Sequence, residues 1–316
     1  MNTLWKSHLR LATLLAGSSV LAMAQPTISA RPGVLNYTEG SVSLNGLPLR
    51  AKAIGSTEIA PGEVLQTASG KAEVLLTPGA FVRLDDHSEL RMISPSLTNT
   101  QVALQKGRAL VEVDQLEKEN HLEITVNDTH AVLVKKGIYS FDADQPSVAV
   151  YDGRALVREG DREVELGKGK ELPLSAGLGA QPRKFDRKQT GDLYAWSKLR
   201  SQYMAEATAS SARTIVVNNP GWYYGTGWYW NPFFDSWAFV PGSGYFYNPF
   251  GYGFYSPSYV YYYPVYGYRG GGFGGYHGGG YRGSRGGGFQ PAPRPVAPAP
   301  APAGGSGVHF GGTGRR

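Results

Sequence analysis

Arg108-Ala-Leu-Val-Glu-Val113 and Leu122-Glu-Ile-Thr-Val126 are two short segments in which the side-chain character alternates along the chain. Successive side chains of a β-strand point to opposite faces of the sheet, so this alternation predicts strands with one buried and one solvated face. Comparable segments follow one another between residues 31 and 175. They predict an all-β domain, either a multi-stranded sandwich, a roll or a solenoid.

The predicted strands are short and are separated by turn-forming residues. They cover residues 34–38, 41–44, 63–67, 72–76, 81–84, 89–93, 101–104, 108–113, 122–126, 129–134, 138–142, 147–151, 154–157 and 163–166. The predicted turns are Glu39-Gly40, Asn45-Gly46, Ser69-Gly70, Pro78-Gly79, Lys106-Gly107, Asn127-Asp128 and Asp152-Gly153. We assign residues 25–180 to this domain, which is large enough to bury a core although the chain has no cysteine.

Composition divides the chain of 316 residues into an ordinary part and a low-complexity part. Of its 64 glycines and prolines, 38 fall in the last 98 residues, which excludes a two-domain enzyme that fills the whole length. Residues 269–316 carry six arginines and no acidic residue, whereas residues 25–268 carry a net charge of −2. The net charge of +6 therefore belongs largely to a cationic tail, and this bears on partners rather than on fold.

The first 24 residues have the pattern of an export signal. Lys6 and Arg10 precede an apolar run from Leu11 to Ala24, which ends in Ala-Met-Ala. The alternative is an uncleaved membrane anchor, but 14 helical residues span only about 21 Å, less than a hydrocarbon core of about 30 Å. We therefore expect residues 1–24 to be a signal peptide and the protein to act in the periplasm, at the cell surface or outside the cell.

One helix is predicted after the β-domain, within residues 186–215. Leu193, Trp196, Leu199 and Tyr203 recur at three- and four-residue spacing, and Thr190 or Asp192 can cap the start of the helix. We expect this apolar stripe to pack on the β-domain. A helix that docks a partner protein is the alternative.

Residues 219–268 contain an aromatic repeat. Gly225-Thr-Gly-Trp-Tyr-Trp-Asn-Pro-Phe233 aligns with Gly242-Ser-Gly-Tyr-Phe-Tyr-Asn-Pro-Phe250 at a constant offset of 17 residues. The Gly-x-Gly element predicts a turn, the three aromatic residues an extended segment, and Asn-Pro its end. We favour rings that pack on one another and on the β-domain, because dense aromatic clusters bury their own faces first. The alternative is a surface for sugar rings or wall polymers.

Residues 269–316 are rich in Gly and Arg and then in Pro and Ala, so we expect a disordered tail. After an export signal, anionic lipid or wall polymers suit such a tail better than nucleic acid does. The candidate contact surface comprises Trp222, Trp228, Tyr229, Trp230, Trp237, Tyr245, Tyr247, Arg282 and Arg285.

No segment of the sequence indicates catalysis. Asp85-Asp86-His87 and Asn127-Asp128-Thr129-His130 have residue types that bind metals, but their position between strands favours turns. Neither a phosphate loop nor a Gly-x-Ser-x-Gly motif is present. We expect no enzyme, no cofactor, no metal and no catalytic residue, and an exported hydrolase is the weakest hypothesis.

Several of these strands also carry a family resemblance. The segments are Gly62-Glu-Val-Leu-Gln-Thr67, Ala72-Glu-Val-Leu-Leu76, Gly79-Ala-Phe-Val-Arg-Leu84, Gln101-Val-Ala-Leu-Gln-Lys-Gly-Arg-Ala-Leu-Val-Glu-Val113 and Val148-Ala-Val-Tyr-Asp-Gly-Arg-Ala-Leu-Val157. In this order they resemble a FecR-type domain, the periplasmic part of the iron-dicitrate sensor family, over about residues 55–160. The family usually has Gly-Thr where this chain has Gly137-Ile138. It also has a cytoplasmic anti-sigma segment and a membrane helix before the domain, which we do not find here.

Two functions remain open. The first is a non-enzymatic protein of the cell envelope whose FecR-like domain binds a protein or a polymer, with the aromatic repeat and the tail adding contacts. The second is a periplasmic signalling component that the resemblance implies, which acts through a separate membrane partner.

Overall fold

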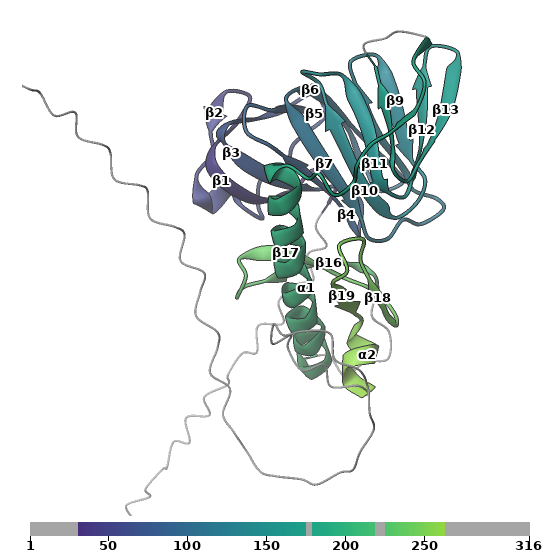
Figure 1. The fold of residues 1–316 in the computed structure, drawn as a ribbon. Coiled ribbons are helices and arrows are strands. Elements are labelled where there is room, and N and C mark those ends of the chain that lie inside the picture. The colour runs from purple at the N-terminus through teal and green to yellow at the C-terminus, as the bar shows by residue number, and fades with distance from the viewer. Residues whose placement is uncertain (1–30, 175–178, 219–224, 263–316) are drawn as a thin grey trace, which may run out of the picture. The chain divides into compact units, whose positions relative to one another are not determined.

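The computed structural model describes residues 31–174, 179–218 and 225–262 (Figure 1). The strands of the first part are β1 (Leu35–Leu44), β2 (Leu47–Pro48), β3 (Val64–Leu75), β4 (Ala80–Leu84), β5 (Glu89–Ser96), β6 (Asn99–Lys106), β7 (Arg108–Val113), β8 (His121–Val126), β9 (Thr129–Leu133), β10 (Gly137–Asp142), β11 (Ser147–Asp152), β12 (Arg154–Glu159), β13 (Arg162–Gly167), β14 (Lys170–Pro173) and β15 (Arg183–Lys184). Helix α1 (Asp192–Asn218), strands β16 (Gly227–Asn231), β17 (Ser236–Val240), β18 (Tyr245–Tyr247) and β19 (Gly253–Tyr255), and helix α2 (Pro257–Tyr262) follow.

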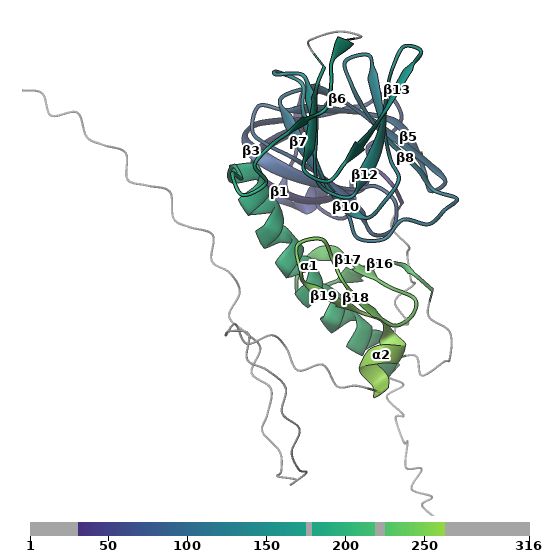
Figure 2. The same cartoon turned by 45° about the vertical axis from the view of Figure 1, so that its right-hand side comes forward.

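Strands β1 to β15 form one sheet. Its order is β13-β12-β9-β8-β6-β5-β3-β4-β7-β10-β11-β14-β15, with β1 paired to β3 and β2 to β1. Strands β6 and β8 run parallel, and the other pairs in the described residues are antiparallel. Near one edge β13 contacts both β11 and β14, so the sheet rolls back on itself (Figure 2). The all-β prediction is confirmed, and of the three predicted architectures the structure has the roll.

The roll encloses a core made by every second side chain of its strands. On β3 and β4, Ala72, Val74, Val82 and Leu84 point into this core and are fully buried. The residues between them point to the outer face, as alternation along a strand requires. Part of that outer face is also buried, because α1 and the segments after it lie on it.

Two of the predicted turns are wrong. Glu39-Gly40 lies inside β1 and Ser69-Gly70 lies inside β3, and the two strands pair there, with Gly40 opposite Gly70. The register shifts directly after this pair, so the glycines mark a β-bulge. A Cβ atom on either glycine would overlap the backbone of the other strand, and Gly40 has a φ of +69°. At Gly40 and Gly70, glycine is therefore required because two strands approach closely, and not because the chain reverses its direction.

Helix α1 begins at Asp192 and ends three residues beyond the predicted range, and its buried face shares Leu193 but not Leu199 with the predicted apolar stripe. Leu199, a member of the predicted apolar stripe, is 46% exposed. The buried residues of α1 are Leu193, Ser197, Arg200, Ser201, Met204, Ala205, Ala207, Thr208, Ser211 and Ala212. Most of them are small or polar, so the face that packs against the sheet is not the most hydrophobic one. No helix in the described part of the chain is long and apolar enough to cross a membrane.

The aromatic repeat forms two hairpins. The first hairpin is β16 and β17, and the second hairpin is β18 and β19. In each, the aromatic triplet makes the first strand and Asn-Pro follows it, at Asn231 and at Asn248. Both hairpins pack on α1, and buried rings of the first one reach the outer face of β3 and β4.

Candidate binding surface

A row of buried charges joins the roll to α1. Glu73 on β3, Arg83 on β4 and Glu112 on β7 lie side by side on the outer face of the roll. The Arg83 guanidinium donates to Glu73 at 2.7 Å and to Glu112 at 2.6 Å. From α1, Arg200 donates to Glu73 at 2.9 Å and the Ser201 hydroxyl donates to Glu112 at 2.7 Å. All five side chains are buried, so each charge depends on its partner.

The two arginines keep Glu73 ionised. Burial alone would raise the pKa of its carboxyl group, but Arg200 and Arg83 outweigh burial and lower the pKa of Glu73 to about 2. Burial acts in the opposite sense on Arg83, and the Glu112 and Glu73 carboxylates outweigh it, so the pKa of Arg83 is raised. Glu73 and Arg83 are therefore both charged at neutral pH.

Each hairpin is attached to α1 through the asparagine of its repeat. The Asn248 amide donates to Glu112 at 2.7 Å and to the hydroxyl of Ser201. The Asn231 amide donates to Ser211 at 3.1 Å and to a backbone carbonyl of α1 at 3.0 Å. In both, the side-chain oxygen accepts a backbone N–H of the following turn. Asn231 and Asn248, which are aligned in the sequence repeat, therefore attach the two hairpins to two different places on α1.

The first hairpin is also bound to the roll, and this buries two of the predicted contact residues. Trp237 exchanges two backbone hydrogen bonds with the Asn36 side chain, at 2.7 and 3.2 Å, and its ring N–H donates to the carbonyl of Gly55 at 2.8 Å. Trp228 is 1% exposed and meets Phe81 edge-on, with ring centroids 4.9 Å apart. Neither indole offers a face to a ligand, so the assignment of Trp228 and Trp237 to the contact surface is wrong.

Two further predicted residues are half-buried. The ring of Trp230 lies 5.6 Å from that of Trp237 and against Gly55. The hydroxyl of Tyr229 donates to the carbonyl of Gly225 at 2.9 Å. The remaining predicted contact residues outside the second hairpin lie beyond the described residues: Trp222, Arg282 and Arg285.

The second hairpin carries the exposed rings. Tyr245 is 52% exposed and Tyr247 is 60% exposed. Tyr245 lies 4.8 Å from Tyr259 of α2 and 6.3 Å from Tyr255 of β19, measured between ring centroids, and Tyr247 lies 6.2 Å away. We call Tyr245, Tyr247, Tyr255 and Tyr259 the tyrosine cluster. Tyr245 and Tyr247 are its exposed members, whereas Tyr255 also packs on the hydrophobic cluster that contains Ala212 of α1.

Tyr255 and Tyr259 were not among the contact residues predicted from the sequence. The repeat alignment ends at Phe250, but the same offset of 17 places Phe254 opposite Trp237, and both belong to the returning strand of a hairpin. Extending the alignment past the Asn-Pro turn would have predicted that β19 lies beside β18. It would then have placed Tyr255 next to Tyr245.

The candidate metal residues lie in turns and ion pairs. His87 has a φ of +52° in the turn between β4 and β5, and Asp85 is buried in ion pairs with Lys71 and Arg108. His130 contacts Glu123 at 2.7 Å, and His121 contacts the same carboxylate at 3.0 Å. Among the described residues, no group of three or more His, Cys, Asp or Glu side chains is placed to hold a metal ion.

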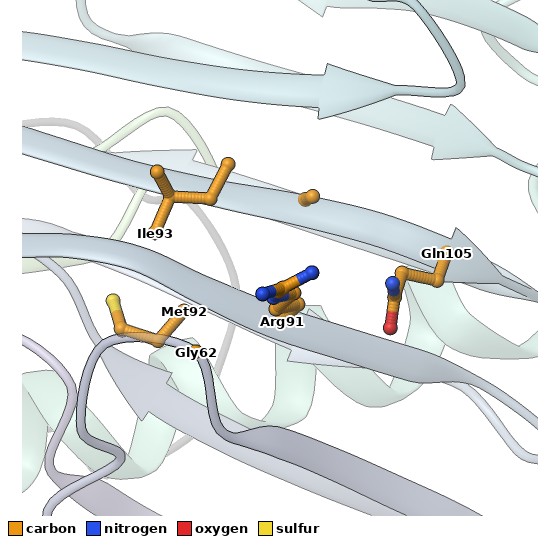
Figure 3. A pocket seen from close by; sticks show the side chains of 6 residues that line it. Gly62, Arg91, Met92, Ile93 and Gln105 are labelled. Atoms are coloured by element: carbon orange, nitrogen blue, oxygen red, sulfur yellow. The ribbon is translucent and has the colours of Figure 1, made fainter.

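A hollow of about 380 Å³ lies over β5 and β6 (Figure 3). Gly62, Met92, Ile93, Ala103 and Gln105 line it together with Arg91, its one charged lining residue. An arginine without a nearby acid or nucleophile among the lining residues can bind an anion but cannot transfer a proton. The hollow therefore provides no catalytic arrangement.

The family called FecR protein matches residues 63–156, from the start of β3 to the middle of β12. Residues 63–156 are a FecR domain. Two crystal structures of a candidate anti-sigma factor from Parabacteroides distasonis, at 1.65 and 2.50 Å resolution, are similar to this chain. Their sequence identities are 11% and 12%, each with a TM-score of 0.36, and the alignment covers 57% of this chain and 99% of theirs. No curated protein matches the chain.

The FecR domain contains the three strands that carry Glu73, Arg83 and Glu112. The partners of these residues, Arg200, Ser201 and Asn248, lie outside the FecR domain in α1 and the second hairpin. The tyrosine cluster is therefore an addition to the FecR domain that buried ion pairs and hydrogen bonds hold in place.

Proposed function

We propose that this chain is a non-enzymatic, exported protein that binds a protein or polymer of the cell envelope through the tyrosine cluster. The observation that carries the proposal is the position of Tyr245 and Tyr247. Both rings are more than half exposed on a hairpin whose Asn248 is tied to the buried Glu112 of the FecR domain.

Such a surface is suited to binding because its rings are already placed. Tyrosine offers a large apolar face with a polar edge and loses little rotamer freedom on contact. In the tyrosine cluster each ring packs on a neighbour, which restricts it before a ligand arrives. Flat, adjacent rings of this kind suit sugar rings or an extended peptide.

The positions of two of the three perturbed carboxyl groups support a binding role over a catalytic one. Glu73 has a lowered pKa and Asp114 has a raised one, and both are buried. The third, Glu123, is partly buried, and its pKa is lowered because its contacts with His130 and His121 outweigh burial. A catalytic acid or base has to reach its substrate, and perturbed groups in structural ion pairs are a common alternative to an active site. Glu73 serves the attachment of α1, so its shifted pKa has a structural cause.

Export and the remaining partners belong to the same proposal. Residues 1–24 have the pattern of a signal peptide, and the six arginines of residues 269–316 add attraction to anionic lipid or wall polymers. Both segments lie outside the described residues. Nucleic acid is a poor partner for an exported chain.

A second candidate function is signalling through a separate membrane protein. The FecR match over residues 63–156 favours it, because the resemblance implies a regulatory rather than a catalytic role. In this case the tyrosine cluster would contact the partner protein instead of a polymer.

The two functions are separated by sedimentation with isolated wall polymer and with solubilised envelope proteins. We compare the natural chain with Tyr245→Ala/Tyr247→Ala and with the control Tyr261→Ala/Tyr262→Ala, since Tyr261 and Tyr262 are 65% and 66% exposed but lie outside the tyrosine cluster. We expect the first variant to lose at least about tenfold in affinity, as for paired aromatic contact residues, and the control to bind normally. Equal binding by all three proteins would refute the proposed surface. Loss that is confined to a membrane receptor would support signalling.

A further inference from the structure

A second, chemically different cleft lies where the second hairpin meets the roll. Its volume is about 470 Å³, within the range of small-ligand sites. It is lined by Lys135, Lys136, Asp152, Gly153, Lys168, Asn248 and Pro249. The lysines, Asp152 and Gly153 come from three strand connections of the roll, and Asn-Pro comes from the repeat. The second hairpin therefore supplies one wall of the cleft and the roll supplies the rest.

The lining residues carry an excess of positive charge. Lys168 forms an ion pair with Asp152 at 2.9 Å. Lys135 and Lys136 are exposed, and within the described residues neither has an ion-pair partner. Three ammonium groups against one carboxylate leave a net charge of +2 at the cleft. This is opposite in sign to the net charge of residues 25–268 as a whole, which is −2.

Asp114 lies near Lys136 but does not line the cleft. Burial, and then the adjacent Glu112 carboxylate, raise the pKa of Asp114 well above its ordinary range, while Arg83 and Lys136 lower it by less. The charged form of Asp114 is therefore disfavoured. The Glu112 carboxylate accepts from Arg83, Ser201 and Asn248, and the one acidic residue that lines the cleft, Asp152, pairs with Lys168.

The walls of the cleft are fixed before any ligand binds. The buried Tyr139 hydroxyl donates to the carbonyl of Lys135 and accepts the N–H of Arg154 at 3.1 Å, so it ties together two of the three connections. A Cβ atom at Gly153 would overlap this hydroxyl, and one at Gly137 would overlap the carbonyl of Asp152. These close contacts hold the backbone on both sides of the lysines, and a preorganised site loses little freedom on binding.

We propose that this cleft binds the phosphate group of a ligand. Lysine binds phosphate as a compact point charge, whereas planar carboxylates are best matched by the arginine fork, and the lining residues include three lysines and no arginine. A net charge of +2 complements a phosphate monoester. The same chemistry is offered by free phosphate, by a soluble phosphate ester and by a phospholipid headgroup.

The test uses the full chain and three probes, namely inorganic phosphate, glycerol phosphate, and vesicles of phosphatidic acid, whose headgroup is a phosphate monoester, in phosphatidylcholine. Binding is measured by calorimetry for the soluble probes and by co-sedimentation for the vesicles. The variant Lys135→Gln/Lys136→Gln removes the two unpaired charges of the cleft. The control Lys188→Gln/Lys198→Gln removes the same charge from two exposed lysines elsewhere.

We expect saturable binding of at least one probe, weakened about tenfold or more in the cleft variant and less than about twofold in the control. Loss confined to vesicles identifies a lipid headgroup as the source of phosphate, and loss confined to the soluble probes identifies a free ligand. The proposal fails if no probe binds saturably, or if the two variants lose equally, because attraction to the overall charge would then account for binding. Because both variants replace exposed side chains, their melting temperatures should match that of the natural chain.

Discussion

Glu73 is one of the two buried carboxylates of the roll that hold α1 in place. Its two carboxylate oxygens accept from Arg83 and Arg200, and Asn36 donates to it as well, at 2.9 Å. The residue is completely buried. Removing its charge leaves the buried guanidinium groups of Arg83 and Arg200 with one carboxylate fewer. The loss in free energy of unfolding then comes mainly from these unpaired buried charges, and less from the lost hydrogen bonds themselves.

We predict that Glu73→Gln lowers the free energy of unfolding by about 3 to 5 kcal/mol at pH 7. The control is Glu163→Gln, which removes an exposed ion pair with Arg158 at 3.3 Å and should cost less than about 1 kcal/mol. Urea unfolding of both variants measures the difference. A cost for Glu73→Gln no larger than that of the control would contradict the role of the buried row.

The lowered pKa of Glu73 also makes its contribution to the free energy of unfolding depend on pH. The pKa of this group is 4.5 before folding and about 2 after it, so the folded chain binds the proton less well than the unfolded chain. The corresponding contribution, about 3 kcal/mol, is fully present above pH 4.5 and is lost as the pH falls towards 2. The gap between the natural chain and Glu73→Gln should therefore narrow over that interval.

At the scale of the elements, the strands were predictable and the packing of the helix was not. Segments such as Arg108–Val113 alternate because one face of each strand meets the core of the roll, and that is a local property of the sequence. The face of α1 that contains Ser197, Arg200 and Ser201 meets the carboxylates of Glu73 and Glu112. These partners lie far away in the sequence, so no periodicity within the helix indicates which face is buried.

The glycines also show that a short stretch of sequence does not determine how a residue is used in the fold. Gly46 lies in a turn as predicted, whereas Gly40 and Gly70 allow two paired strands to approach each other. Both kinds of position need a residue without a Cβ atom, and the sequence around them is equally turn-like. The partner strand decides between them, and the partner is known only once the register is known.

We predict that Asn231→Ala loosens the first hairpin without unfolding the roll. The substitution removes hydrogen bonds to Ser211 and to a carbonyl of α1, and leaves buried groups unpaired at a cost of about 1 to 3 kcal/mol. Backbone amides of β17 should exchange with deuterium faster, whereas those of β7 should not. Asn218→Ala, at the exposed end of α1, is the control. Unchanged exchange in β17 would show that the aromatic rings alone hold the hairpin.

At the scale of the whole molecule, we predict that limited proteolysis leaves a resistant fragment that extends at least to Val260. The sequence predicts a β-domain and a helix up to about residue 215 and a disordered tail from residue 269. The structure extends the packed part, because Phe254 is fully buried and Val260 is nearly so. Mass spectrometry of the fragments measures the end point. Early cleavage between 225 and 255 would contradict the docking of the hairpins.

The candidate sites could be predicted only in part, for a reason that holds for the molecule as a whole. Tyr245 and Tyr247 could be proposed as contact residues because aromatic composition is visible in one short segment. The lysine-lined cleft could not be proposed from the sequence, since Lys135, Lys168 and Asn248 come from separate connections that only the fold brings together. Sites assembled from distant parts of a chain leave no local pattern.

Asn36 pairs with Trp237 across 201 positions of sequence, and Glu73 with Arg200 across 127. During synthesis, the sheet emerges long before the segments that cover it. Until then Leu75 and Phe81, which are fully buried in the finished protein, lie open on the outside of the roll. The newly made chain therefore exposes an apolar surface for a time and is then prone to aggregate. A chaperone that binds unfolded chains would be most needed in that interval.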